Sequence, residues 1–186
     1  VVEQVKRELD EKQIDYDHDL SLGIMVEVPS VAFFIPQLAG IIDFMSIGTN
    51  DLTQYFLAVD RGNGQVSSLY QSRHPGLLAL IRKIIEDGRC EVIALTLGKD
   101  GAVLITAEES RRVGTPELET KSSVGAGDSF VAGMVLGLVR ELSLRQAFCY
   151  GNAAGAAALL TPGTELCLKE DVEQIYEQIC AAWSNP

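Results

Sequence analysis

Residues that bind transition metals or form disulfides are scarce in this 186-residue sequence. It contains two histidines and four cysteines, and no two of the cysteines form a C-x-x-C pair. The cysteines lie far apart along the chain, at Cys90, Cys149, Cys167 and Cys180. Such spacing indicates neither a zinc site nor a disulfide framework. We therefore expect reduced, partly buried thiols.

Basic residues are scarce as well, with 15 lysines and arginines against 26 aspartates and glutamates, which gives a formal net charge of −11. Binding to a phosphate backbone needs clustered basic residues, so nucleic acid is not an expected partner. No apolar stretch is long enough to cross a membrane, and no charged-then-apolar leader is visible. We therefore expect no membrane association and a cytoplasmic location. Apolar residues make up 47% of the chain, which is typical of a globular protein.

Residues 122–137 are the most informative stretch. A polar segment with glycines at 125 and 127 leads to Asp128 and an apolar run, which is typical of a loop that opens onto a buried helix. The first amides of such a helix attract anions, and the two glycines let a phosphate approach the backbone. A carboxylate there repels phosphate unless it accepts the proton of the attacking group, so Asp128 predicts phosphoryl transfer to a hydroxyl. The G-A-G-D motif alone fits equally well an aspartate that caps an ordinary buried helix.

Two predicted strands in the N-terminal half are followed by acidic residues. Residues 22–29 form a buried strand with Glu27 near its end, and Asp51 follows a second strand at 41–47. The carboxyl ends of parallel strands open onto one face, so Glu27 and Asp51 could share a hard cation, and Mg²⁺ suits two carboxylates and a substrate phosphate. Arg61 adds a guanidinium fork for a phosphate or carboxylate.

The remaining patterns predict an α/β fold with a mostly parallel sheet flanked by helices. Helices are expected at 2–13, 30–40, 75–88, 143–160 and 169–183, and strands at 91–97, 102–106 and 113–118. The preferred arrangement is one compact domain whose sheet continues from the first two strands into residues 91–97 through a right-handed β-α-β crossover. A partial barrel exposes strand edges, so the pieces must pair with each other or with another chain, for example as a homodimer.

Three motifs in the second half resemble the C-terminal part of ribokinase-like sugar kinases, nearest to the phosphofructokinase B and 1-phosphofructokinase branch. They are T-L-G-K-D-G-A at 96–102, S-x-V-G-A-G-D-S at 122–129 and T-P-G-T at 161–164. The resemblance covers about residues 80–180 and implies ATP as the phosphoryl donor and a sugar phosphate, such as a fructose phosphate, as the acceptor.

The kinase resemblance also implies roles for individual residues. Asp128 would be the catalytic base, and the backbone of Gly125, Ala126 and Gly127 would form the anion hole. Nucleotide contacts would come from Thr96, Gly98, Asn152, which lies near adenine in the family, and Gly163, in a loop by the base and a monovalent cation.

The first half carries a second resemblance, to the phosphoenolpyruvate-binding barrel of the enzymes that use that substrate, above all Enzyme I of the sugar phosphotransferase system. It rests on G-I-M-V-E-V-P-S at 23–30, D-F-M-S-I-G-T-N-D-L-T-Q-Y at 43–55 and A-V-D-R-G-N at 58–63, and covers about residues 1–85. It implies that Glu27 and Asp51 bind Mg²⁺, and that Asn50 and Arg61 bind phosphoenolpyruvate.

The chain thus resembles a chimera of two segments, with residues 1–86 from a partial (β/α) barrel and residues 87–186 from a ribokinase-like kinase. Each segment lacks part of its family's substrate site: the sugar-binding region and the N-x-x-E segment in the second, and most of the barrel, with its catalytic cysteine strand, in the first. Three hypotheses follow: a sugar-kinase-type phosphotransferase, a remnant that binds Mg²⁺ and phosphoenolpyruvate, and a catalytically silent chimera.

Overall fold

The structure of the chain is a computed structural model that describes residues 1–163 and 165–184. Of the motif residues named above, Thr164 lies outside the described part. Two compact units are present, Val1–Cys90 and Glu91–Pro186, and each is considered by itself. No helix in the described part has both the length and the apolar character required to span a membrane.

The α/β class is confirmed, but its arrangement differs from the single sheet that we expected. The described strands form two separate sheets, and only one strand pair among them is parallel. Each sheet belongs to one unit and contributes to that unit's own apolar cluster. Two small cores therefore replace the one expected core.

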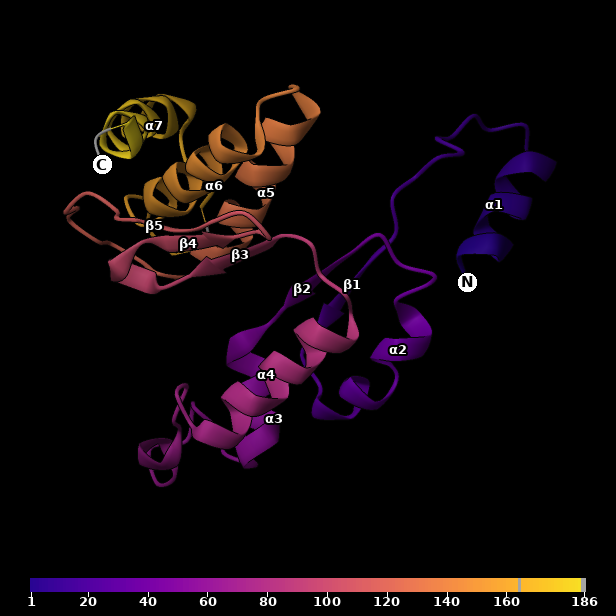
Figure 1. Cartoon of the computed structure of the whole chain (residues 1–186), viewed down its shortest axis with the longest axis horizontal. Helices are drawn as coiled ribbons and strands as arrows, with labels where there is room; N and C mark the ends of the chain where they lie inside the picture. The colour runs from indigo at the N-terminus through magenta and orange to yellow at the C-terminus, as the bar shows by residue number, and fades with distance from the viewer. Residues whose placement is uncertain (164, 185–186) are drawn as a thin grey trace. The chain divides into compact units, whose positions relative to one another are not determined.

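The first unit is built on two parallel strands (Figure 1). Its elements in chain order are α1 (Val2–Glu11), β1 (Gly23–Val26), the 3-10 helix η1 (Pro29–Phe33), α2 (Ile35–Leu38), β2 (Phe44–Ile47), α3 (Thr49–Leu57), η2 (Ser67–Leu69) and α4 (Pro75–Asp87). The parallel register pairs Gly23 with Phe44 and Val26 with Ile47. The core consists of Val26, Ala32, Ile35, Leu52, Leu77 and Ile84, whereas α1 buries no residue.

Proline positions explain the helix starts in this unit. Proline suits the first helical turn, where its missing N–H needs no partner. Pro75 begins α4, and the Nδ1 atom of His74 accepts the amide of Gly76 at 3.2 Å, so His74 is the N-cap. The helix expected at 30–40 is instead two short pieces, η1 and α2, each with a proline in its first turn and no side-chain cap. Ser30, predicted as the cap, lies inside η1.

The second unit combines an antiparallel sheet with three helices. The sheet contains β3 (Ile93–Thr96), β4 (Ala102–Ile105) and β5 (Ser110–Val113) in that order, with the 3-10 turn η3 (Gly98–Asp100) between the first two. The hairpin of β3 and β4 confirms the predicted antiparallel return. The third strand ends at Val113, where we expected an edge strand to begin. Helices α5 (Ala126–Val139), α6 (Leu144–Ala158) and α7 (Lys169–Ser184) follow.

Small residues bring α5 and α6 into close contact. A Cβ atom added to Gly133 of α5 would lie 2.6 Å from the Cβ atom of Ala154, and one added to Gly151 of α6 would lie 2.8 Å from the carbonyl oxygen of Phe130. Gly137 meets Ala147 in the same way, at 2.8 Å from its Cα atom. Contacts under 3.0 Å exclude any side chain without a shift of the helices, so these glycines set the spacing between α5 and α6.

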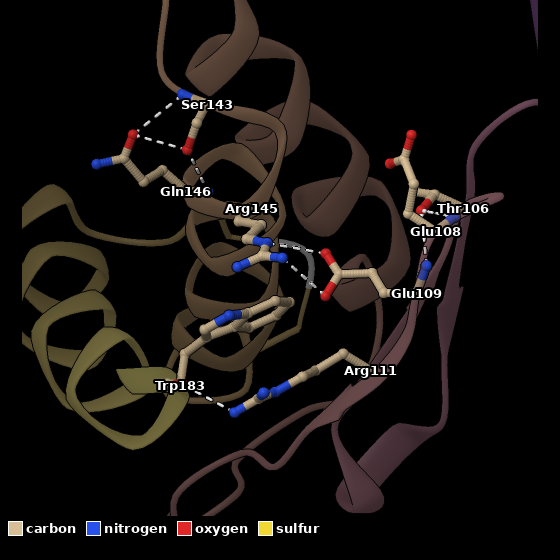
Figure 2. A network of polar contacts seen from close by, with 8 residues as sticks. All are labelled: Thr106, Glu108, Glu109, Arg111, Ser143, Arg145, Gln146 and Trp183. Carbon is tan, nitrogen blue, oxygen red and sulfur yellow. Dashed lines mark hydrogen bonds and ion pairs between the residues drawn. The ribbon is translucent and has the colours of Figure 1, made fainter. Parts of the chain in front are cut away.

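A network of polar contacts connects the sheet with α6 and α7 (Figure 2). Arg145 of α6 donates two hydrogen bonds to the carboxylate of Glu109, at 2.8 and 3.1 Å, and its guanidinium lies 6.0 Å from the ring centre of Trp183. Arg111 of β5 donates to the carbonyl oxygen of Trp183 at 2.8 Å. At the start of α6, Ser143 and Gln146 form a reciprocal capping box, which confirms Ser143 as the predicted cap. These contacts hold the C-terminal helices against the sheet.

The close α5–α6 contact predicts that an alanine substitution lowers the stability of the protein at Gly133 but leaves it unchanged at Gly127, in the same helix. Gly133→Ala should lower the free energy of unfolding by about 1–3 kcal/mol, because the new methyl group overpacks the interface. Gly127→Ala is the matched control, because a Cβ atom there meets nothing within 4 Å. Denaturant unfolding followed by the fluorescence of Trp183, the single tryptophan, measures both. Equal stability of the two variants would contradict the packing account.

Candidate functional site

The N-terminus of α5 presents free backbone donors. Gly125 precedes the helix with φ 77° and ψ 0°, a left-handed conformation that favours glycine. The amide of Ser129 closes the first helical hydrogen bond, to the carbonyl oxygen of Gly125 at 2.8 Å. Within the described residues, the amides of Ala126, Gly127 and Asp128 have no acceptor. Three donors and the helix dipole are therefore available to an anion.

The carboxylate predicted to be the base is accessible. Asp128 is exposed and lies in the first turn of α5, beside the free amides. Gly127 is exposed too, and open space surrounds the position where its side chain would start. No side chain caps the helix, so Asp128 is not the helix cap that the alternative interpretation required.

Helix α6 packs against the first turn of α5. A Cβ atom on Gly155 would lie 3.0 Å from the carbonyl oxygen of Ala126 and 3.2 Å from the Cβ atom of Phe130. The ring of Phe130 is buried, and its centre lies 5.8 Å from that of Phe148 in an edge-on arrangement. The first turn of α5 is therefore fixed by contact with a neighbouring helix.

The segment before Gly125 is tied to the loop after α6. The amide of Lys121 donates to the carbonyl oxygen of Leu159 at 2.7 Å, and the hydroxyl of Ser122 donates to the carbonyl oxygen of Gly163 at 2.9 Å. The same hydroxyl accepts the amide of Val124 at 3.2 Å. Our sequence reasoning missed Ser122, although a serine just before a glycine turn is a recognisable signal for such local bonds. The structure thereby brings Gly163 beside the G-A-G-D loop.

Asn152 is buried, with 5% of its surface exposed, and its amide group is hydrogen-bonded within the protein. Its Nδ2 atom donates to the carbonyl oxygen of Gly114 at 3.3 Å, and the hydroxyl of Thr115 donates to its Oδ1 atom at 3.3 Å. The sequence argument that a polar amide in this helix must find a partner is satisfied by these two residues. Contact between Asn152 and a nucleotide base stays a prediction.

Thr96 and Gly98 lie at the turn between β3 and β4. Thr96 is the last residue of β3 and pairs with Ala102, whereas Gly98 begins η3 with φ 60°. The turn is held by Arg112, whose guanidinium donates twice to the carbonyl oxygen of Asp100, at 3.0 and 3.2 Å.

The β3–β4 turn and the G-A-G-D loop approach the same helix. Gly101, which ends the turn, packs tightly against Val113 and Gly114, and Gly114 is the residue bonded by Asn152. Gly155, one helical turn after Asn152, contacts Ala126. Both loops therefore meet the C-terminal half of α6.

A hollow of about 470 Å³ adjoins Gly163. It is lined by Glu119, Lys121, Leu160, Thr161, Pro162, Glu165, Leu166, Leu168 and Asp171. Thr161 is buried, and its hydroxyl lies 3.0 Å from the carbonyl oxygens of Ala158 and of Glu165, which shapes the wall. The T-P-G sequence indicated a loop here. Nothing in the sequence predicted that Glu119 and Asp171, which lies at the start of α7, would help to line a hollow beside it.

In the first unit, the structure brings Asp51 and Arg61 together. Asp51 lies in the first turn of α3, and its Oδ1 atom is 3.4 Å from Nη2 of Arg61. Glu27 follows β1 directly. A Cβ atom on Gly48, the N-cap of α3 just after β2, would lie 3.1 Å from the Oε2 atom of Glu27. Asn50 accepts the hydroxyl of Tyr70 at its carbonyl oxygen, at 3.2 Å.

The predicted metal ligands form at most a partial site. No group of three or more histidine, cysteine, aspartate or glutamate side chains in the described residues is placed to hold a metal ion. Glu27 and Asp51 are two hard oxygen donors, and Mg²⁺ commonly takes one or two carboxylates together with substrate oxygens and water. The donor chemistry therefore fits Mg²⁺ only with ligands from a bound substrate and solvent.

Two family models match the chain, one over its first part and one over its second, in the same order as the two sets of motifs. The model of the PEP-utilising enzyme, PEP-binding domain, matches residues 1–99, and that of the pfkB family carbohydrate kinases matches residues 64–171. The ATP-dependent 6-phosphofructokinase isozyme 2 of Mycobacterium tuberculosis is 46% identical over 103 residues, which are 55% of this chain and 30% of that protein. The phosphoenolpyruvate-protein phosphotransferase of Haemophilus influenzae is 50% identical over 91 residues, which are 49% of this chain and 16% of that protein. The chain thus spans less than a third of either relative.

Solved structures support the kinase-like fold. Phosphofructokinase-2 from Escherichia coli, solved in complex with potassium, has a TM-score of 0.59 at 24% identity, and the likeness covers 94% of this chain and 62% of that one. Ribokinase from Thermotoga maritima has a TM-score of 0.53 at 18% identity, over 84% of this chain and 56% of that one. Each family model matches more than half of the sequence. The chain therefore belongs to two families, the PEP-utilising enzymes through its first half and the pfkB carbohydrate kinases through its second.

Proposed function

We propose that the chain supplies the catalytic loop of an ATP-dependent phosphotransferase that moves a phosphoryl group to a hydroxyl of a sugar phosphate, such as a fructose phosphate. The observation that carries this proposal is the N-terminus of α5, where an exposed Asp128 lies beside three amides without acceptors among the described residues. Free amides stabilise the negative charge that develops during transfer, and a carboxylate next to them suits proton abstraction.

Each residue of the loop has a distinct task. The amides of Ala126 and Gly127 donate to the oxygens of the transferring group, and Gly125 supplies the left-handed turn that points the chain into the helix. Asp128 accepts the proton of the sugar hydroxyl. Bound ATP, with its Mg²⁺, supplies the phosphoryl group and partly neutralises its charge.

The nucleotide is proposed to lie between the two loops that meet α6. Thr96 and Gly98 would contact its phosphates or ribose, and Gly163 and the adjoining hollow would receive the base. Asn152 holds Gly114 and Thr115, and thereby supports this region from within the core. A hollow of 470 Å³ falls in the range of small-molecule sites.

The sugar site requires more surface than the matched kinase segment provides. The chain spans 30% of the length of the phosphofructokinase relative. Helix α5 also leaves apolar side chains exposed, including Val135 at 49% and Val139 at 74%. A helix that is apolar on all sides is normally covered. We therefore expect a second copy of the chain to cover the exposed face of α5 and the edges of the short sheets.

Replacement of the base provides the direct test. Asp128→Asn keeps the shape of the side chain but removes the proton acceptor, so ATP-dependent phosphorylation of a fructose phosphate should fall about 10²–10⁴-fold in kcat. The affinity for ATP, measured by calorimetry, should fall little, because the amides of the loop remain. Glu170→Gln is the matched control, since Glu170 is exposed in the first turn of α7. Full activity of Asp128→Asn, or absence of ATP binding by the wild-type chain, would overturn the proposal.

A second candidate function belongs to the first half, and the Asp51–Arg61 pair favours it. An arginine fork beside the carboxylate of Asp51 suits a phosphorylated carboxylic acid held by Mg²⁺. We propose that Glu27 and Asp51 hold Mg²⁺ while Asn50 and Arg61 bind phosphoenolpyruvate. The chain covers 16% of the phosphotransferase relative, so binding without turnover is the expected activity.

Calorimetric titration with phosphoenolpyruvate tests the second function. Binding should require Mg²⁺ and disappear in Glu27→Gln and in Asp51→Asn, because each variant removes a charged ligand of the ion. Glu86→Gln, on the exposed side of α4, should bind like the wild type. Binding that is independent of Mg²⁺, or retained in both variants, would exclude this assignment. A stable chain that binds neither ATP nor phosphoenolpyruvate would be the catalytically silent chimera.

A further inference from the structure

The sequence contains a single asparagine that is followed by glycine, at Asn63-Gly64. Both residues are exposed and lie in the loop between α3 and η2. The backbone nitrogen after an asparagine can attack the side-chain amide, and a glycine there hinders the attack least because it has no Cβ atom. Of the other asparagines, Asn50 and Asn152 lie within helices, and Asn185 precedes a proline, which has no N–H. Asn63 is therefore the asparagine whose neighbour best suits such an attack.

The backbone nitrogen of Gly64 is available as the nucleophile. In the part of the chain that the structure describes, its N–H has no acceptor. Two nearby amides are occupied, since Gly62 donates to Oδ1 of Asp60 at 2.8 Å and Gln65 donates to Oδ1 of Asn63 at 3.0 Å. A Cβ atom added at Gly64 would meet nothing within 4 Å, so the space around this residue is open. Attack by the Gly64 nitrogen therefore breaks no hydrogen bond of its own.

The side-chain amide of Asn63 is held in a way that favours attack on its carbon atom. The oxygen Oδ1 accepts the amide of Gln65, and this oxygen is the atom that gains negative charge when a nucleophile adds to Cγ. A fixed N–H donor at that atom stabilises the developing charge. The backbone carbonyl oxygen of Asn63 accepts the amides of Val66 and Ser67, at 3.1 and 2.9 Å, which hold the residue in the turn. The same turn thus positions the electrophile and leaves the nucleophile free.

We propose that Asn63 is a modification site, at which the chain converts its own asparagine to aspartate and isoaspartate by way of a succinimide. The nitrogen of Gly64 loses its proton to solvent base and bonds to Cγ of Asn63, and the bond from Cγ to Nδ2 breaks as ammonia leaves. Water then adds to either carbonyl carbon of the ring and breaks the bond of that carbon to the ring nitrogen. Opening at Cγ gives aspartate, and opening at the backbone carbonyl carbon gives isoaspartate. One water is consumed, one ammonia is released, and no group is oxidised.

The conversion changes both the charge and the backbone of this loop. Either product adds a negative charge two residues after Arg61, which is paired with Asp51 at 3.4 Å. In isoaspartate the main chain runs through the former side chain and is longer by one atom, so the bonds from Val66 and Ser67 to the carbonyl oxygen of Asn63 should weaken. The inference rests on the loop alone and is independent of the proposed phosphotransferase activity and of phosphoenolpyruvate binding.

Incubation of the full chain followed by peptide mapping tests the proposal. The folded protein is kept at mildly alkaline pH, and mass spectrometry of the digest follows the conversion of each asparagine to its acid. An aspartate-specific protease then separates aspartate, which it cleaves, from isoaspartate, which it does not. We expect both products at Asn63, with Asn50 and Asn152 unchanged as internal controls. Because the folded turn places a donor on Oδ1, the folded chain should convert Asn63 at least as fast as the same chain in urea.

Two glycine variants supply a matched pair. Gly64→Ala should slow the conversion several-fold, because the new methyl group hinders the attacking nitrogen, whereas Gly40→Ala should convert like the wild type. Both glycines are exposed, and a Cβ atom at either meets nothing within 4 Å, so neither change disturbs the fold. Equal rates in the two variants, conversion of Asn50 or Asn152 ahead of Asn63, or a folded chain that converts Asn63 more slowly than the chain in urea would overturn the proposal.

Discussion

The close contact of α5 with α6 is the constraint on which the proposed site depends. Gly133, Gly137 and Gly151 leave no room for side chains between the two helices, so their axes approach more closely than larger residues would permit. This contact continues to Gly155, which meets Ala126 in the first turn of α5. The free amides and Asp128 are therefore presented by a helix whose start is held in place by its neighbour. A loop that must stabilise developing charge benefits from such rigidity, because fixed donors need no reorganisation during the reaction.

Each of the two units buries apolar side chains in a core of its own. The first unit has a small core of six buried apolar residues around two parallel strands, and the second has a larger core shared by its sheet and three helices. The two motif sets meet near α4 and β3. The two family matches overlap over residues 64–99, which include both elements. Each unit nevertheless leaves apolar side chains exposed, such as Phe33 at 75% and Val139 at 74%.

Sequence patterns predicted most of the elements because the deciding signals are local. Ser143 marked the start of α6, and the two glycines before Asp128 marked the start of α5. The predictions were wrong where the local sequence pattern was weak, or where the structure depends on which distant strands pair. The edge strand was expected at 113–118, beginning three residues too late, because β5 begins with the polar run Ser110-Arg111-Arg112. The single mostly parallel sheet was inferred from helix and strand order, which does not specify which strands pair.

The composition of the sites was predicted less completely than the elements. The G-A-G-D loop could be identified because its chemistry lies in consecutive residues. Ser122 and the hollow beside Gly163 depend on contacts between segments that are distant in the sequence.

The measurement that tests the central claim most directly is a nuclear magnetic resonance titration of the labelled chain with ATP and Mg²⁺. The account predicts that the amide signals of Ala126, Gly127 and Asp128 shift downfield and saturate together, because these donors gain phosphate acceptors. The signals of residues in the middle of α5, such as Gly133, should move far less. Saturable binding that leaves the three amide signals unchanged would contradict the claim that the start of α5 receives the phosphoryl group.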